Sequence, residues 1–322
     1  MNLLDEVKNC KTIAITGHIR PDGDCVGAVM GVYLYLSKLL PEALIVPMIE
    51  KPSEEFGCIA HIEDIRSDFS SENEVFDAFI GLDSSTTDRY GDALKYFEKA
   101  KKRIIIDHHV SNDGFGDVSY VDGNASSTCE LVYDVLNHDA LDVDIAKALY
   151  IGIIHDTGVL HYSNTSPKTL RTVAALVEFG FDFSEIIDRT FYEKTHLQNE
   201  MLGRALMESI EFMDGKCIFS KIDRKTMDFY GAVPHDFEGI VNQLKNTKGV
   251  EVAIFMYEVE PLNYKVSLRS NGVVDVSKIA KFYNGGGHVR AAGFNMNGTY
   301  RDVINNISDS IAIQLDRKNI SL

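Results

Sequence analysis

Short apolar runs alternate with helical patterns along the first half of the chain, and this alternation constrains the fold more than any other feature. Helices are expected at residues 25–39 and 88–101, and a further helix begins near Ser126, with Glu130 in its first turn. Strands are expected at residues 12–16, 43–49, 78–83 and 103–107. Strands that alternate with helices form βαβ units around a mainly parallel sheet. We therefore predict an α/β domain with a parallel sheet.

Four apolar segments of this region end in carboxylates or imidazoles. Ligands of open α/β sheets bind in the crevice outside the carboxyl ends of the strands, so these polar tips can meet at one place. A single tip is explained at least as well by a capping Asp or a buried core His. Four tips together favour one shared site. The candidate residues are His18, Asp22, Asp24, Asp83, Asp107, His108, His109, His155 and Asp156.

The first tip carries His18, Asp22 and Asp24 on a loop that is broken by Pro21 and Gly23. Proline fixes its own φ and glycine adopts conformations closed to other residues, so the loop can turn all three polar side chains inward. Two carboxylates that lie close together repel each other and require a raised pKa or a cation between them. The alternative is a turn whose Asp residues only cap the next helix.

The second half of the chain has a different organisation. Residues 166–211 are predicted to be almost entirely helical after a start at Ser166-Pro167, with a connecting helix at 196–212. Beyond Gly215, strands are expected at 216–222, 250–257 and 264–269, and helices at 237–244 and 276–283. We therefore divide the chain into an α/β catalytic domain at 1–190, a helical linker at 191–214 and a smaller α/β domain at 215–322.

The second domain contains three consecutive glycines, residues 285–287, followed directly by His288. Such glycines let backbone N–H groups approach a ligand and form an anion-binding concavity. Arg269, at the end of an expected strand, supplies a further cation. The alternative is a glycine loop that merely joins a helix to a strand.

Composition limits the functions open to this chain. The 322 residues carry a net charge of −16, which argues against binding long duplex nucleic acid but leaves small anionic substrates open. No apolar run approaches the length of a membrane span, and the N-terminus lacks a signal-peptide pattern. The five cysteines are scattered without a CxxC pair, which fits a reduced cytoplasm and not a zinc ribbon.

The motifs and their order resemble the DHH phosphoesterase superfamily over nearly the whole chain. His18-x-x-Pro-Asp-Gly-Asp24, Asp83, Asp107-His108-His109 and Asp156 resemble its catalytic motifs, and Gly285 to His288 resembles its DHH-associated C-terminal domain. In length the chain is most similar to the stand-alone members, the bifunctional oligoribonucleases or nano-RNases. These also remove the 3′-phosphate of phosphoadenosine phosphate.

The resemblance implies a site with two divalent metal ions, most often Mn²⁺. Two ions about 3.5–4 Å apart can share a carboxylate and activate a water for in-line attack on phosphorus. By resemblance, His18 and Asp22 would hold one ion, and Asp24, His108 and Asp156 the other, with Asp83 bridging both. Asp107 would orient its neighbours, and His109 would contact water or the substrate phosphate. The implied substrate-binding residues are His109, Arg269, Gly286, Gly287 and His288.

The implied reaction is the hydrolysis of short oligoribonucleotides to mononucleotides, of phosphoadenosine phosphate, or of both. Base identity is expected to matter little. Hydrolysis of cyclic or linear di-adenylate is the main alternative. A manganese-dependent pyrophosphatase, an exopolyphosphatase, a long single-strand exonuclease and an inactive nucleotide sensor fit less well. The resemblance implies dinucleotides and phosphorylated nucleosides as ligands, and it leaves open whether the protein is a homodimer and what Arg20, Cys25 and His155 do.

Overall fold

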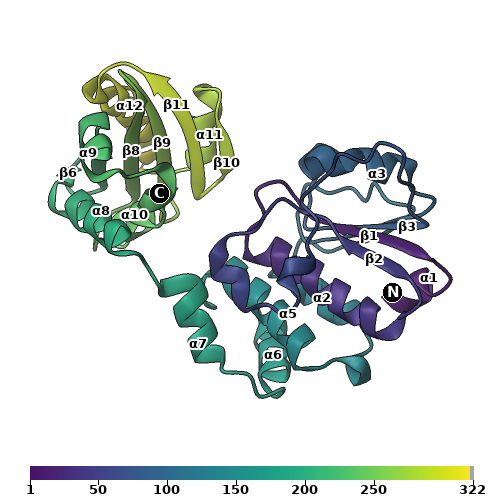
Figure 1. The fold of residues 1–322 in the computed structure, drawn as a ribbon. Helices are drawn as coiled ribbons and strands as arrows, with labels where there is room; N and C mark the ends of the chain where they lie inside the picture. The colour runs from purple at the N-terminus through teal and green to yellow at the C-terminus, as the bar shows by residue number, and fades with distance from the viewer. Residues whose placement is uncertain (320–322) are drawn as a thin grey trace. The chain divides into compact units, whose positions relative to one another are not determined.

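The computed structural model describes residues 1–319, and the chain folds into two compact units (Figure 1). The first unit comprises Met1–Glu193, and the second begins at Lys194. The expected fold class is confirmed in both, because each unit combines helices with one sheet. In the described residues, no helix is long and apolar enough to cross a membrane.

The first unit is built on a five-stranded sheet in which every neighbouring pair of strands is parallel. Its spatial order is β2-β1-β3-β4-β5. The strands are β1 (Thr12–Thr16), β2 (Leu44–Pro47), β3 (Ala78–Leu82), β4 (Arg103–Asp107) and β5 (Val118–Val121). Four of them were predicted to within three residues at each end, and β5 was missed. The parallel order brings the carboxyl ends of β1, β3 and β4 to one edge of the sheet.

One face of this sheet is covered by closely packed helices. They are α1 (Leu3–Val7), α2 (Gly23–Leu39), α4 (Thr128–Val135), α5 (Val143–Asp156), α6 (Pro167–Val177) and α7 (Phe183–Ile187). Close approach depends on glycine, since a Cβ added at Gly27 of α2 would lie 2.5 Å from the carbonyl oxygen of Ala148 in α5. A Cβ at Gly152 would likewise overlap the Cys129 sulfur. These glycines let the three helices that reach the polar edge of the sheet converge there.

The other face is covered by Met48, Phe69 and Phe76, by the 3₁₀ segment Thr87–Ala93 and by α3 (Leu94–Lys99). A single helix at 88–101 was expected, and this was wrong. Gly91 adopts φ 53° and ψ −129°, a kink that ends the first segment before α3 begins. The kink also packs the chain against Ile19, which a Cβ on Gly91 would meet at 2.5 Å.

The fourth polar tip ends a helix, whereas the other three follow strands. His155 and Asp156 are the last residues of α5, which is buried along most of its length. A helix buried on nearly all sides lacks amphipathic periodicity, so its apolar run cannot be distinguished from a buried strand. Residues 166–211 are largely helical as predicted, but a π-helical turn (Asp188–Tyr192) separates α7 from α8 (His196–Met207).

The second unit contains a six-stranded mixed sheet in the order β10-β11-β9-β8-β7-β6. The strands are β6 (Ile210–Phe212), β7 (Cys217–Ile222), β8 (Val252–Glu260), β9 (Asn263–Ser270), β10 (Gly286–His288) and β11 (Ala291–Asn297). Its helices are α8, α9 (Arg224–Tyr230), α10 (Ile240–Lys245), α11 (Val276–Phe282) and α12 (Tyr300–Asn319). Separate cores lie on the two faces of the sheet.

One expectation for this region needs correction, and one segment forms a strand where none was predicted. The connecting helix predicted at 196–212 ends at Met207, and Ile210–Phe212 instead pairs with β7. Residues 286–288 form a short strand that pairs antiparallel with β11. The predicted linker also contributes to a core, because Met201 and Ala205 of α8 are buried against residues of the second unit.

Candidate metal centre

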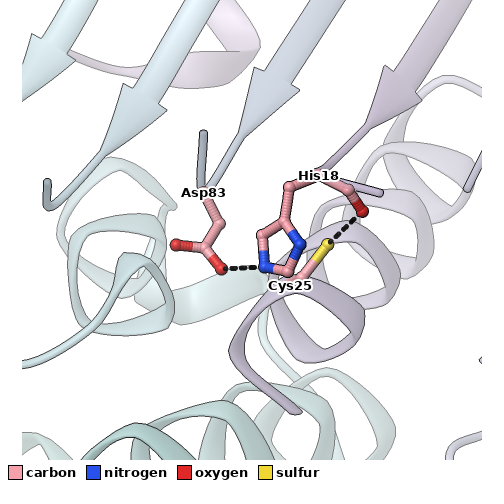
Figure 2. Close-up of side chains that lie close together, drawn as sticks. All are labelled: His18, Cys25 and Asp83. Atoms are coloured by element: carbon pink, nitrogen blue, oxygen red, sulfur yellow. Dashed lines mark hydrogen bonds and ion pairs between the residues drawn. The ribbon is translucent and has the colours of Figure 1, made fainter. Parts of the chain in front are cut away.

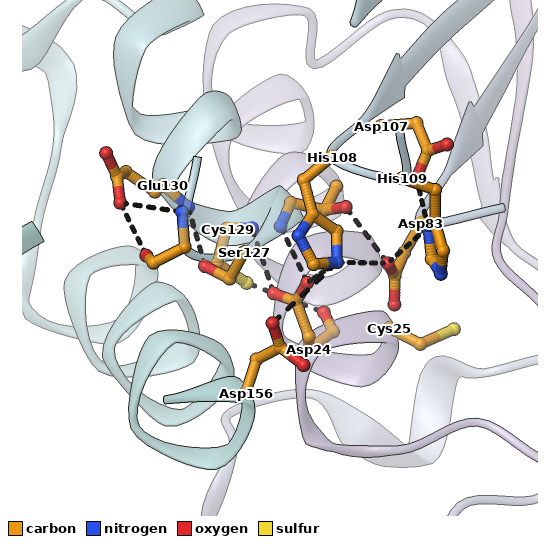
Figure 3. Close-up of polar contacts among 12 residues, drawn as sticks. Asp24, Cys25, Asp83, Asp107, His108, His109, Ser127, Cys129, Glu130 and Asp156 are labelled. Atoms are coloured by element: carbon orange, nitrogen blue, oxygen red, sulfur yellow. Dashed lines mark hydrogen bonds and ion pairs between the residues drawn. The ribbon is translucent and has the colours of Figure 1, made fainter. Parts of the chain in front are cut away.

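The polar tips of the first unit converge at the carboxyl edge of its sheet (Figure 3). β1, β3 and β4 each deliver residues directly after their last strand position. The N-terminal ends of α2 and α4 and the C-terminal end of α5 approach from the helical face. The structure thus brings together all six residues for which metal ligation was predicted.

Asp83 lies at the centre of this cluster, buried to 2% exposure. Its Oδ2 is 3.4 Å from Nε2 of His18, and its Oδ1 is 3.6 Å from Nε2 of His108. The Thr128 hydroxyl donates a hydrogen bond of 3.0 Å to Oδ1. The Asp83 backbone has φ +52°, a left-handed conformation that costs about 1–3 kcal/mol for a residue with a side chain. A carboxylate whose two oxygens face two different imidazoles is arranged to bridge two cations.

His18 presents Nε2 to the carboxylates of Asp22 and Asp83, and Figure 2 shows the contact with Asp83. Its Nδ1–H donates to the Ile19 carbonyl at 2.9 Å, so Nε2 is the ring nitrogen that faces the carboxylates. Asp22 Oδ2 lies 3.6 Å from that nitrogen. Burial lowers the pKa of His18, but Asp22 and Asp83 outweigh it and raise the pKa to about 10. The two carboxylates thus attract a positive charge to this position.

Asp22 caps a helix and keeps one oxygen directed at His18. Its Oδ1 accepts hydrogen bonds of 3.1 Å from the backbone N–H groups of Asp24 and Cys25, and so caps α2. Its Oδ2 remains directed at His18. The capping hydrogen bonds hold the carboxylate in place while leaving one oxygen for a cation.

Asp24, His108 and Asp156 form a second group beside Asp83. Nε2 of His108 lies 3.9 Å from Asp24 Oδ2 and 3.7 Å from Asp156 Oδ2. Burial and the charges of Asp83 and Asp156 raise the pKa of Asp24 well above its usual range. Burial also raises the pKa of Asp156, to about 6. Three acidic side chains this close are unfavourable without a positive charge among them.

The donor set fits divalent cations. Two ligands that bind the same ion at about 2.1 Å lie roughly 3–3.5 Å apart, and the imidazole–carboxylate separations here are 3.4–3.9 Å. Carboxylates and imidazoles without thiolate favour Mn²⁺ and similar ions over thiolate-seeking ones. The described residues therefore include acidic and histidine groups that can hold divalent metal.

Asp107 faces away from the other carboxylates. Its Oδ1 accepts a 2.7 Å hydrogen bond from Nδ1 of His109, and its Oδ2 accepts one of 2.7 Å from Asn112. Hydrogen bonding to Asp107 raises the pKa of His109. With Nδ1 engaged, Nε2 is the ring nitrogen of this partly exposed imidazole that remains available to a ligand.

Three residues were left without an assigned role, and the structure gives each a structural environment. The buried Cys25 thiol points at the His18 carbonyl oxygen, 3.9 Å away, and burial raises its pKa well above the usual range, which disfavours thiolate ligation. The His155 ring packs against Phe56 and Phe191, with Nε2 2.9 Å from the Thr190 hydroxyl. Arg20 is exposed.

Sequence reasoning missed a network around Glu130, which is buried to 1% exposure. Glu130 Oε2 accepts hydrogen bonds from the Ser126 hydroxyl at 2.5 Å and the Thr169 hydroxyl at 2.8 Å. This contact fixes the segment that leads into α4. The next residues, Thr128 and Cys129, donate backbone hydrogen bonds of 2.6 and 2.9 Å to Asp24.

Asn164 extends this network to the fourth tip. Its Nδ2 donates to the Ser126 carbonyl at 2.8 Å and to the Asp156 carbonyl at 3.1 Å. The segment at residues 126–129 was noticed only as a helix start. The signal that could have revealed more is a Glu in the first turn of a helix whose neighbouring residues are mostly apolar.

The second unit places Arg269 on β9 and His288 on β10, the two strands that flank β11. Ala291 pairs with His288 on one side and with Arg269 on the other, which puts both side chains on the same face of the sheet. The Arg269 guanidinium donates to Asn242 Oδ1 at 2.9 Å and to the Leu268 carbonyl at 3.0 Å. His288 is exposed.

The glycines of this motif are largely explained by strand packing. A Cβ at Gly285 would overlap the backbone of Gly293, and one at Gly287, which has φ +136°, would overlap the backbone of Ala291. A Cβ at Gly286 would meet nothing within 4 Å. Only Gly286 is therefore left without a packing reason.

The first unit is a parallel α/β domain with a carboxylate–imidazole cluster at its strand ends. A smaller unit with a mixed sheet follows it. This combination defines a class of two-domain enzymes. Residues 12–153 match the DHH family N-terminal domain, and residues 214–313 match the DHHA1 domain. The chain belongs to the DHH family.

Several relatives that resemble the chain over most of its length share one name. Proteins of Bacillus subtilis and Thermus thermophilus, both named "bifunctional oligoribonuclease and PAP phosphatase NrnA", are 27% and 30% identical. The alignments cover 88% of both chains for the first, and 89% of this chain and 84% of the relative for the second. The crystal structure of an exopolyphosphatase-related protein from Bacteroides fragilis shares the fold, with a TM-score of 0.87 and 21% identity over 96% of this chain and 94% of that one.

Proposed function

We propose that this protein is a metal-dependent phosphoesterase that hydrolyses short oligoribonucleotides to mononucleotides and removes the 3′-phosphate of phosphoadenosine phosphate. The observation that carries the proposal is the position of Asp83 between two imidazole–carboxylate groups. The names of the relatives support the substrate class, because both activities break a phosphorus–oxygen bond beside a ribose.

In this proposal, two divalent ions, with Mn²⁺ the expected metal, are held by separate residue groups. His18 and Asp22 hold one, Asp24, His108 and Asp156 hold the other, and Asp83 contributes one oxygen to each. When bound, the ions would neutralise phosphate charge and activate a water nucleophile. Thr128 and Cys129 orient Asp24, so that its oxygens keep a fixed direction during turnover.

His109 is proposed to act on the substrate itself. The hydrogen bond from its Nδ1 to Asp107 favours the protonated ring, which leaves Nε2–H as a donor. A partly exposed donor beside Asp83 can bind a phosphate oxygen and stabilise the charge that develops on it. Asp107 is then a positioning residue, since it acts through His109.

The second unit is proposed to grip the nucleotide through Arg269, His288 and the backbone of Gly286 and Gly287. One charge-assisted hydrogen bond to phosphate contributes about 1.5–3 kcal/mol, equal to roughly ten- to a hundredfold in kcat/KM. Arg269→Ala and His288→Ala should therefore impair hydrolysis of dinucleotides. A simple aryl phosphodiester should be much less affected. Equal losses on both substrates would remove these residues from substrate binding.

A panel of substrates tests the proposal directly. Purified protein with Mn²⁺ is assayed on di- to pentaribonucleotides, phosphoadenosine phosphate, cyclic and linear di-adenylate and pyrophosphate, with products separated by chromatography. We expect mononucleotides from the short RNAs and phosphate from phosphoadenosine phosphate, and no hydrolysis after chelation. Activity on pyrophosphate alone, or full activity after exhaustive chelation, would overturn the proposal.

A further inference from the structure

A cavity of about 180 Å³ opens at the carboxyl ends of β1 and β2, directly beside His18. It has room for about six water molecules at ~30 Å³ each. Its walls combine flat apolar surfaces with two acidic side chains. The residues that matter are Ile19, Ile49, Phe69, Tyr90, Glu50 and Asp92.

Contacts between distant parts of the chain build this cavity. The backbone N–H of Ile19 donates to the Arg89 carbonyl at 2.8 Å, and that of Arg20 donates to Glu50 Oε2 at 2.6 Å. The Ser67 hydroxyl donates to the Ile49 carbonyl at 2.9 Å. These contacts tie together the loops that follow β1 and β2 and the kinked segment before α3. The cavity is therefore preformed.

One wall carries a polar group whose hydrogen bonding is incomplete. Tyr90 is only 3% exposed, and its hydroxyl has no hydrogen-bond partner among the described residues. The hydroxyl lies over Gly81, where a Cβ would overlap it, at the sheet edge that carries Asp83. Because the hydroxyl is buried against the sheet, the remainder of the Tyr90 side chain lines the cavity.

The chemistry of the walls selects the kind of ligand. Glu50 and Asp92 are exposed and lie at the mouth of the cavity, where their charges would repel a phosphate. Carboxylates accept hydrogen bonds from N–H groups, and the aromatic walls suit a flat ring. The space fits one heterocycle and not a whole nucleotide.

We propose that this cavity binds one nucleobase of the substrate and favours bases that carry an exocyclic amino group. The inference rests on the proposed function and refines it, since base identity was expected from sequence to matter little. His18 belongs both to the cavity wall and to the metal centre, so a base seated here leaves its phosphate close to Asp83.

The first test measures binding without catalysis. Adenosine and purine riboside differ only in the 6-amino group and lack phosphate. Each is titrated into the full chain after chelation, and saturation-transfer NMR detects the bound nucleoside. We expect adenosine to bind more tightly, by about tenfold for a hydrogen bond to a charged group. Equal binding of the two nucleosides, or no binding, would overturn the proposal.

The second test uses charge-neutral variants that keep the shape of the cavity. Glu50→Gln and Asp92→Asn should each reduce the preference in kcat/KM for an adenine dinucleotide over its purine counterpart, by up to about tenfold. Asp88→Asn is the matched control, because Asp88 is an exposed carboxylate of the same segment outside the cavity. An unchanged preference in both cavity variants would refute the assignment.

The outcomes separate this proposal from the proposed function and from a cation site. If no dinucleotide is hydrolysed, the proposed function fails, and nucleoside binding still decides the cavity. A cation site would give a different result. The wild-type chain would bind an additional Mn²⁺, Glu50→Gln and Asp92→Asn would abolish this binding, and adenosine would not bind. In that case the proposal is wrong.

Discussion

Replacing Asp83 by Asn tests whether one carboxylate serves two cations. Asn keeps the shape of the side chain and can still accept the hydrogen bond from Thr128, but it removes the negative charge. In the structure the two oxygens face His18 at 3.4 Å and His108 at 3.6 Å, so the change affects both groups of ligands. If each cation loses one charge-assisted contact of about 1.5–3 kcal/mol, the combined loss is about 3–6 kcal/mol. That loss corresponds to a fall in kcat of roughly 10²–10⁴-fold.

The assay compares kcat and KM on a dinucleotide at saturating Mn²⁺, with metal stoichiometry followed by electron paramagnetic resonance. Asp88→Asn serves as the control, because this exposed carboxylate lies outside the cluster. We expect the Asp83 variant to bind at least one ion weakly while its melting temperature without metal stays at or above that of the wild type. If the variant retains more than about a tenth of the wild-type kcat, its activation free energy has risen by less than ~1.4 kcal/mol, and the bridging role is refuted.

Three further outcomes follow from the contacts of individual residues. Glu130→Gln should weaken Mn²⁺ binding by about ten- to a hundredfold, because it loosens the start of α4, which orients Asp24. Lys168→Met should weaken Mn²⁺ binding less. Metal titration measures both effects. The pKa of His108 is raised to about 9 in the metal-free protein, and metal ligation requires the neutral ring. Mn²⁺ affinity should therefore increase as pH rises from 7 to 9, and an affinity that does not change with pH would contradict this. Gly287→Ala should lower the free energy of unfolding by about 1–3 kcal/mol, with Gly286→Ala as a near-neutral control in thermal denaturation.

Local patterns predicted the parts of the site that follow strands. Asp83 and His108 stand directly after short apolar runs, and the parallel order of β1, β3 and β4 brings these positions to one edge. The alternation of strands and helices is encoded within a few residues, so it can be recognised without knowing any distant contact.

The remaining parts depend on contacts between distant residues. No helix or strand was predicted for the apolar segment before Asp156, because α5 is buried on nearly all sides and its helical period is hidden. Thr128 meets Asp83 across 45 positions, and no local pattern indicates that pairing. The glycines at 285 and 287 suggested anion binding, yet each is required by the close approach of β11.

The burial of Asp24 among other carboxylates has a consequence for stability. Backbone N–H groups at the start of α4 offset part of the charge, but the pKa of Asp24 remains well above its usual range because of burial and of Asp83 and Asp156. Without metal, the folded chain therefore binds a proton at Asp24 more tightly than the unfolded chain does, so its stability decreases as pH rises above the usual carboxylate range. Cations that bind only the folded chain reverse that penalty and add binding free energy to it. We therefore expect the acidic cluster that suits phosphoester chemistry to make the first unit depend on bound metal for part of its stability.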